Sequence, residues 1–505
     1  MRTRHSFYNI LVNTISSTII PILGFVKVRL FVDLYGSQIN GLQLVFMQII
    51  MYMNMFELAY SIAFRQLLYK PLANDDKEKV KAIYNGSIKI FRGTGMVLLI
   101  LIPIVSFFVP EFTVVNLPNF FVSILFVILA LPFALSYFLM GPNFVIIADQ
   151  KEYKIGIWIQ SISIMRMILM IVVILLKLPF VYIFLIEGLQ VFVANLIARI
   201  VALKNYPWLK EKSEEMDHSF AKNAKYTVAH RLAYIAINNS DNIIINAFLG
   251  LRSVSIFGVY NYLIDAIIRI INSVITAPIN SFGNLFNDKE RNPLLIFNEF
   301  YSFATYIASV ISVCIYVFVN HFVLIWIGKE DYILSQSVAA FLALNVFYLT
   351  QREPLVISRD TNGLFKESRN LAYIMAIVKI LLSVLLVTNY GVAGILFATL
   401  FSNWVVDYSY TPRLVFKEVF KSNVLKFYAK SLQALALACG LAFISSHLFN
   451  YFEPFYTVSV INFLITAVIV GGFTAITLFI IYFISYKSFR DIVSRGKSLI
   501  FRGGA

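Results

Sequence analysis

Long apolar runs separated by short polar connections dominate the chain. A membrane-spanning helix needs roughly 20 apolar residues, and the pattern contains about fourteen runs of that kind. The predicted spans cover residues 9–32, 41–63, 90–109, 119–142, 156–176, 179–203, 227–249, 254–277, 297–320, 333–352, 369–388, 392–412, 429–449 and 458–485. We therefore predict an all-α polytopic membrane protein.

Lysine and arginine are distributed unevenly between the two sides of the predicted membrane. Of 42 such residues, 32 lie at the termini or in even-numbered connections, three lie in odd-numbered connections and seven lie inside the spans. Insertion retains the basic residues of short loops on the cytoplasmic side, so we expect both termini in the cytoplasm of a bacterial plasma membrane protein. The net charge of +15 is spread over these segments, which favours anionic membrane lipid over nucleic acid as a partner.

Composition and loop lengths limit the function classes. The chain is 59% hydrophobic, only 14% charged and has a mean hydropathy of +0.78, more than a soluble domain of this length can bury. The sequence predicts neither a metal site nor a cofactor, because its two cysteines fall within spans and its five histidines lack metal-ligand spacing. Outward connections of about a dozen residues or fewer leave no outer catalytic domain, and no nucleotide-binding motif is present. We therefore expect a protein that is not an enzyme.

The longer cytoplasmic connections suggest how the chain is organised. We predict an N-terminal lobe of six spans at 1–205, a polar linker at 206–226, a C-terminal lobe of six spans at 227–416, and a further helix pair with a basic tail at 417–505. A hairpin with a glycine at its outer turn, Gly36 and then Gly250, recurs after roughly 215 residues. Two lobes related by a pseudo-twofold repeat would produce this echo, although any two helical hairpins can look alike at this level.

Polar side chains follow one face of spans one, two, seven and eight. Together they predict a hydrated cleft between the lobes, and hydrogen bonding between packed helices is the alternative interpretation. The four stripes are Asn9, Asn13, Ser16, Gly24 and Lys27; Asn40, Gln43, Asn54, Glu57 and Ser61; Arg231, Tyr234, Asn238, Asp241 and Asn242; and Asn261, Tyr262, Asp265, Arg269 and Asn272.

Several basic residues lie at membrane depth, where a charge costs about 2.5 to 3.5 kcal/mol on insertion scales and therefore faces protein or water. Arg166 and Lys379 fall near the middle of their spans. Lys27 and Arg29 lie near the outer end of span one, where their ammonium and guanidinium groups either snorkel to the interface or face a cavity. Arg269 lies four residues after Asp265, a spacing typical of an ion pair.

Four acidic residues at membrane depth have no opposite charge one helical turn away. They are Glu57, Glu187, Asp241 and Asp407. Each is a candidate for exchanging H⁺ or helping to bind Na⁺ as a coupling ion. Pairing with an arginine on a neighbouring helix is the alternative, and the sequence leaves both open.

Several short motifs, in order and spacing, resemble a known family. They are Arg29-Leu30-Phe31, Tyr35-Gly36-Ser37, Asn40-Gly41-Leu42, Glu57-Leu58, Leu68-Tyr69-Lys70-Pro71-Leu72-Ala73, His230-Arg231, Asn239-Ser240-Asp241, Phe282-Gly283-Asn284, Pro354, Gly363, Tyr390-Gly391-Val392 and Gly394. Over about residues 8–430 the chain resembles the Wzx-like polysaccharide flippases of the multidrug/oligosaccharidyl-lipid/polysaccharide exporter superfamily. It departs from the family at Val28, where proline is frequent, and at Gln38, where an acidic residue is frequent.

The resemblance implies a MATE-like fold and a substrate made of an oligosaccharide joined through diphosphate to undecaprenol, for O-antigen, capsule or exopolysaccharide synthesis. By this resemblance, the candidate residues for binding the diphosphate are Lys27, Arg29, Arg166, Arg231, Arg269 and Lys379. Candidate sugar contacts are Asn54, Asn238, Asn242 and Tyr262. A polysaccharide polymerase and glycosyltransferases are the candidate protein partners.

Two other functions compete with the flippase. A cation-coupled antiporter for drugs or organic cations in the same superfamily should have an acidic cavity, whereas the mid-span charges here are seven basic and five acidic. A membrane glycosyltransferase would need a carboxylate pair or a histidine in a sizeable loop, and the sequence contains no such loop.

Overall fold

The apolar runs of the sequence form long helices. The computed structural model describes residues 2–211, 237, 239–276, 292–364, 367, 369–456 and 459–502, and it describes side chains between residues 18 and 495. Within these ranges the chain forms helices, turns and short connections and contains no strand. Helices satisfy their own backbone hydrogen bonds, which a bilayer core without water demands. The predicted all-α fold class is confirmed.

Nine helices in the described ranges are long and apolar enough to cross a membrane. Two of these segments, Asp241–Ser273 and Asn370–Glu418, each cover parts of two predicted spans. The more polar helices α1 (Arg2–Met53) and α12 (Gln336–Thr361) are not among the nine. These differences explain why nine segments correspond to a larger number of predicted spans. The chain is a multi-pass membrane protein.

By their packing, residues 1–258 form one unit and residues 259–505 form another. The predicted lobe and linker boundaries at 205, 226 and 416 stay a prediction. The first unit contains α1, α2 (Met55–Ala73), α3 (Lys77–Phe112), α4 (Asn119–Ser136), α5 (Gly141–Ala148), α6 (Tyr153–Leu175), α7 (Val181–Asn205), the short η1 (Pro207–Lys210) and the first half of α9 (Asp241–Thr276).

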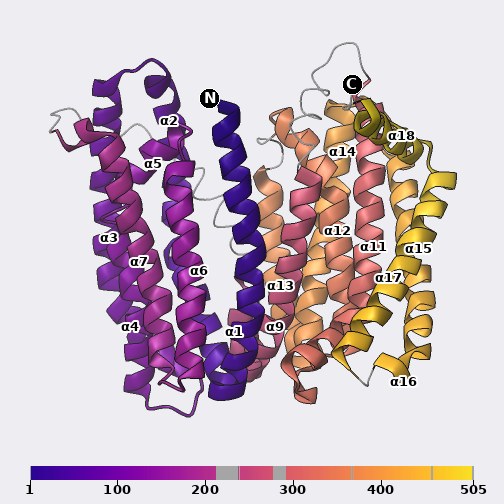
Figure 1. The fold of residues 1–505 in the computed structure, drawn as a ribbon, viewed down its shortest axis with the longest axis horizontal. Coiled ribbons are helices and arrows are strands. Elements are labelled where there is room, and N and C mark those ends of the chain that lie inside the picture. Colours follow the sequence, from indigo (N-terminus) through magenta and orange to yellow (C-terminus); the bar gives the residue numbers. More distant parts are fainter. Residues whose placement is uncertain are drawn as a thin grey trace. The chain divides into compact units, whose positions relative to one another are not determined.

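The helices of the first unit pack around a core of aromatic side chains. In this unit α4 packs against α3 and α7, and α6 packs against α1 and α7 (Figure 1). Phe46 of α1 contacts Phe126 of α4 and Phe184 of α7 edge-to-face, with ring centroids 5.2 and 5.9 Å apart. All three side chains are fully buried. Their contacts hold α1 against α4 and α7 at the depth where polar groups of α1 also meet α7.

Two glycines turn α1 and α9 back on themselves. Gly36 has φ 84° and ψ 168°, and Gly250 has φ 79° and ψ 172°. A residue with a Cβ atom rarely adopts a positive φ of this kind, so glycine is suited to both turns. The glycine turns predicted at these positions are therefore present with nearly the same backbone conformation.

The two glycine-turned hairpins touch within the first unit. Asn40 Nδ2 donates a hydrogen bond to Ser255 Oγ at 2.8 Å, and both residues are buried. The backbone at Gly41 approaches Leu251 so closely that a Cβ atom at position 41 would overlap the Leu251 carbonyl oxygen. Asn40 of the predicted stripe therefore serves helix packing at this contact, as the alternative interpretation of the stripes expects.

The second unit begins with the second half of α9 and ends at the C-terminus. It further contains α11 (Pro293–Ile327), η2 (Glu330–Tyr332), α12, α13 (Arg369–Phe401), the π-helix η3 (Ser402–Asp407), α14 (Tyr408–Glu418), α15 (Leu425–Tyr451), α16 (Glu453–Tyr456), α17 (Val460–Ser485) and α18 (Lys487–Arg502). The predicted C-terminal pair, α15 and α17, packs on α11 around Ala308, Ala438, Phe463 and Tyr482 (Figure 1).

Candidate functional site

The turn in α1 brings two polar residues of the predicted stripes together. Lys27 precedes Gly36 and Gln43 follows it, so the two lie on facing limbs of α1. Lys27 Nζ donates a hydrogen bond to Gln43 Oε1 at 3.0 Å. Lys27 is only 9% exposed and Gln43 only 4%. The lysine therefore points into the first unit and does not snorkel to the surface.

Gln43 connects this lysine to an ion pair between α6 and α7. Gln43 Nε2 donates to Glu187 Oε2 at 3.2 Å, and the other Glu187 oxygen pairs with the Arg166 guanidinium. The next residue, Gly188, lets α7 approach α4, since a Cβ atom there would lie 2.7 Å from the Leu129 carbonyl oxygen. We call Lys27, Gln43, Arg166 and Glu187 the Lys27 cluster.

The Lys27 cluster carries more positive than negative charge. It contains two cationic side chains and one carboxylate, and the Lys27 ammonium also lies 4.6 Å from the centre of the Phe31 ring, which adds a weak attraction. Arg166 Nε is buried and has no hydrogen-bond partner among the described residues. Burying an excess charge and an unpaired donor is costly. An anionic group that reached this cluster would offset both.

A break in the second predicted span forms another polar site in the first unit. Helix α1 ends at Met53 and α2 begins at Met55, with Asn54 between them. Tyr137 Oη donates to Asn54 Oδ1 at 3.2 Å, and the Glu57 carboxylate also interacts with this hydroxyl. The backbone is only locally irregular here, because the Asn54 N–H still donates to the Ile50 carbonyl at 2.9 Å. The predicted sugar contact Asn54 and the predicted coupling residue Glu57 thus share one tyrosine.

Asp407 lies in a dense polar network of the second unit. Arg352 Nη1 of α12 is 2.6 Å from Asp407 Oδ2, and the hydroxyls of Tyr348 and Thr411 also donate to this carboxylate. Asp407 is 4% exposed and ends the π-helix η3. Asp407 and Glu187 both pair with an arginine of another helix, which was the alternative interpretation of the buried acids. Their role in ion coupling stays a prediction.

The remaining predicted cations have different surroundings. Arg29 is half exposed and lies 4.0 Å from Asp33 on the same helix. Arg269 is exposed on α9, while Lys379 of α13 is 1% exposed. Arg231 lies outside the described residues, as does the predicted sugar contact Asn238. Among the predicted diphosphate ligands that the structure describes in the first unit, Lys27 and Arg166 therefore lie in one cluster, and Arg29 pairs with Asp33 instead.

Three other predicted site residues lie on α9. Asp241 and Asn242 occupy its first turn and are partly buried. Tyr262 lies in the second unit, where its ring centroid is 6.2 Å from that of Trp326. Their proposed contacts with sugar or coupling ion stay predictions.

Sequence reasoning missed the residues that connect the predicted ones. Gln43 belongs to the stripe of span two, and the hairpin at Gly36 was the signal that could have placed it opposite Lys27. Arg352 lies at the end of a predicted span and counts there among the cytoplasmic basic residues. No local pattern indicates that Arg352 reaches Asp407, because 55 residues separate them.

Comparisons with known proteins concern the fold. No family model matches the chain, and no curated protein matches its sequence. Among solved structures, the inward closed conformation of the lipid II flippase MurJ has a TM-score of 0.69 at 14% identity, covering 96% of this chain and 100% of that one.

Multidrug transporters also match. An inward-facing multidrug resistance MATE family transporter of the MOP superfamily has a TM-score of 0.54 at 13% identity, over 80% of this chain and 98% of that one. A MATE structure in complex with MaL6 has a TM-score of 0.50 at 12% identity, over 81% and 97%. The predicted MATE-like fold is confirmed, and this chain has the helical membrane fold that these flippase and transporter structures share.

Proposed function

We propose that the chain is a flippase for oligosaccharides linked through diphosphate to undecaprenol. It would carry these lipids across the bacterial plasma membrane by alternating access between its two lobes, driven by an H⁺ or Na⁺ gradient. The observation that carries the proposal is the excess positive charge of the Lys27 cluster, buried within a membrane fold. Similarity in fold to a lipid II flippase supports the same substrate class.

The substrate's chemistry matches the polar groups available. A diphosphate is anionic, and the Arg166 guanidinium and the Lys27 ammonium can both donate charge-assisted hydrogen bonds to it. Sugar hydroxyls need hydrogen-bonding side chains such as Asn54, and the polyprenyl tail can stay in lipid. The transported oligosaccharide would be a repeat unit for polysaccharide biosynthesis. A polysaccharide polymerase and glycosyltransferases would be the protein partners.

A cation-coupled multidrug antiporter is the second candidate. The Glu57 carboxylate at the break between α1 and α2, together with the likeness to MATE structures, favours it. An organic cation would be attracted by Glu57 and repelled by the Lys27 cluster. The two candidate functions therefore require opposite charges of the ligand that binds in the first unit.

Reconstitution tests the proposal. Vesicles containing the protein and a diphosphate-linked glycolipid should expose the glycolipid to a membrane-impermeant glycosidase on the far side. Lys27→Met and Arg166→Gln should each slow this exposure at least tenfold, whereas the control Lys177→Gln, at an exposed residue, should not. Full transport by both cluster variants would remove the Lys27 cluster from the site. Export of a cationic dye without glycolipid transport would favour the antiporter.

A further inference from the structure

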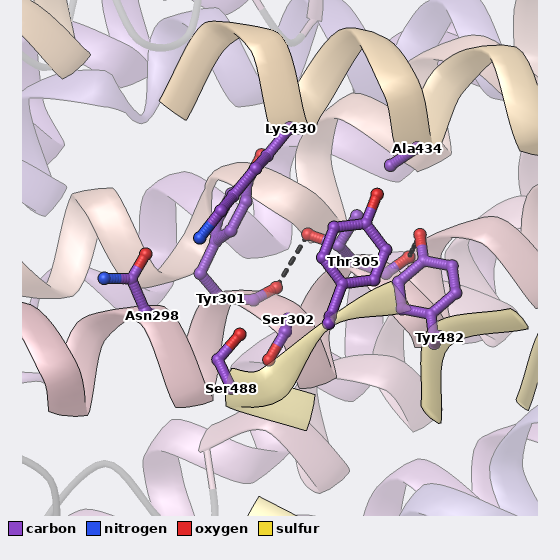
Figure 2. A pocket seen from close by; sticks show the side chains of 9 residues that line it. Asn298, Tyr301, Ser302, Thr305, Lys430, Ala434, Tyr482 and Ser488 are labelled. Atoms are coloured by element: carbon purple, nitrogen blue, oxygen red, sulfur yellow. Dashed lines mark hydrogen bonds between the residues drawn. The ribbon is translucent and has the colours of Figure 1, made fainter. Parts of the chain in front are cut away.

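A small cavity lies where α11, α15, α17 and α18 meet in the second unit. Its volume is about 10 Å³, which is room for one oxygen-sized atom. Figure 2 shows side chains from all four helices around it. The residues that contribute polar groups to its lining include Asn298, Tyr301, Ser302, Lys430, Tyr486 and Ser488.

Some of these polar groups are already satisfied by the protein. Ser302 Oγ donates to the Glu299 carbonyl at 2.9 Å, and Asn298 Nδ2 donates to the Leu294 carbonyl at 2.7 Å. Thr305 Oγ1, also in the lining, donates to the Tyr301 carbonyl at 2.6 Å (Figure 2). These groups line the cavity, and each already donates a hydrogen bond to a backbone carbonyl.

Two tyrosine residues of the lining differ in how well the protein satisfies their hydroxyls. Tyr486 is 8% exposed and Tyr301 is 4% exposed, and the hydroxyl of each is buried without a hydrogen-bond partner among the described residues. The Tyr301 hydroxyl has the hydroxyls of Tyr408 and Ser431 nearby, so Tyr486 carries the stronger argument. A buried hydroxyl without a partner is unfavourable. A bound acceptor atom in the cavity would satisfy it.

The charge around the cavity selects a negative ligand. Lys430 is the charged residue in the described lining, and Figure 2 shows its side chain among those that line the cavity. The nearby carboxylate of Glu299 is held by Arg495 of α18 at 2.9 Å. One ammonium and the unpartnered Tyr486 hydroxyl form a set that suits an anionic oxygen.

The surroundings indicate a lipid as the source of that oxygen. Helix α17 ends at Ser485 and the amphipathic α18 begins at Lys487, with Phe489 of α18 buried in the core of the unit. An amphipathic helix at the end of a spanning helix lies at headgroup level. Leu432 and Ile484 are 67% and 70% exposed, which provides apolar surface for acyl chains on α15 and α17.

We propose that this cavity binds a phosphate oxygen of an anionic membrane lipid. The Tyr486 hydroxyl donates to the oxygen that enters the cavity, while the Lys430 ammonium pairs with the phosphate charge. The small volume admits one oxygen and keeps the glycerol and the acyl chains outside. None of these residues belongs to the Lys27 cluster, so the lipid acts as a bound partner of α15, α17 and α18 in addition to the transported substrate.

Lipid binding to the full-length protein tests the proposal. Native mass spectrometry of detergent-solubilised protein titrated with phosphatidylglycerol or phosphatidylcholine should show at least tenfold tighter binding of phosphatidylglycerol. Lys430→Ala and Tyr486→Phe should each weaken phosphatidylglycerol binding about tenfold, as expected for losing a hydrogen bond to a charged group. The matched controls are Lys426→Ala, four residues away and exposed on α15, and Tyr451→Phe, 81% exposed. Both should stay within about twofold.

Tyr486→Phe also separates a binding role from a folding role. The hydroxyl has no protein partner, so its removal should leave the melting temperature of lipid-free protein unchanged or higher while the lipid-induced rise shrinks. Equal affinity for both lipids, or equal losses in Lys426→Ala and Lys430→Ala, would overturn the proposal. Competition by inorganic phosphate at millimolar concentration without any preference between lipids would overturn the lipid assignment and leave a free phosphate site.

Discussion

Removing the single carboxylate of the Lys27 cluster tests whether its charge balance works as argued. Glu187→Gln preserves the side chain's size and an acceptor for Gln43, but it leaves Arg166 and Lys27 without a negative partner. The positive excess of the cluster then rises from one charge to two. Arg166→Gln changes the balance in the opposite direction, because Lys27 and Glu187 then cancel.

The structure sets the expected magnitude. Glu187 and Arg166 have side chains that are 10% and 16% exposed, so water screens their pairing little. Breaking a buried ion pair costs about 3 to 5 kcal/mol, and the acceptor kept by glutamine places Glu187→Gln near the lower end, at about 3 kcal/mol. The variant that combines Glu187→Gln with Arg166→Gln should lose less stability than the two single variants lose in sum. The coupling energy between the two positions should be about 2 kcal/mol.

Equilibrium unfolding in mixed micelles measures the free energy of unfolding of the unmodified protein, the two single variants and the double variant, which together form a double-mutant cycle. An exposed pair provides the control: Lys417 Nζ lies 3.3 Å from Glu418, with the lysine side chain 82% exposed. Lys417→Gln should therefore change stability by less than about 1 kcal/mol. Additive effects in the cycle, or a loss for Glu187→Gln as small as in the control, would refute the buried pair.

The same two variants should act oppositely on the ligand. Glu187→Gln should retain or strengthen glycolipid binding in correctly folded protein, since the excess charge grows. Arg166→Gln should weaken glycolipid binding at least tenfold. Weakening of similar size in both variants would contradict an electrostatic role and indicate a purely structural one.

Two further predictions concern packing and the second unit. Gly41→Ala should destabilise the protein by about 1 to 3 kcal/mol, because its methyl group would overlap the Leu251 carbonyl oxygen; Gly93→Ala, with open space around its Cβ position, should be neutral or slightly stabilising in the same unfolding assay. Asp407→Asn should lower the free energy of unfolding by about 3 kcal/mol, because it leaves the Arg352 guanidinium without its carboxylate. Adding Arg352→Met should recover much of this stability, and no recovery would contradict the pairing.

The sequence by itself determined the membrane class and much of the helix plan. Runs of apolar residues long enough to span a bilayer leave the backbone few options other than helices, so the fold class follows from local composition. The turns at Gly36 and Gly250 were likewise predictable, because a glycine between two apolar runs is suited to the positive φ that both adopt.

Only the tertiary structure decided which polar groups meet. The sequence made Lys27, Arg29 and Arg166 all candidates for diphosphate binding, yet Lys27 and Arg166 converge on Gln43 and Glu187 while Arg29 stays half exposed beside Asp33. Helical periodicity gives the face of one helix and not the helix opposite it. Partners 21, 55 or 144 residues apart, such as those of Glu187 and Asp407, are set by how the helices pack.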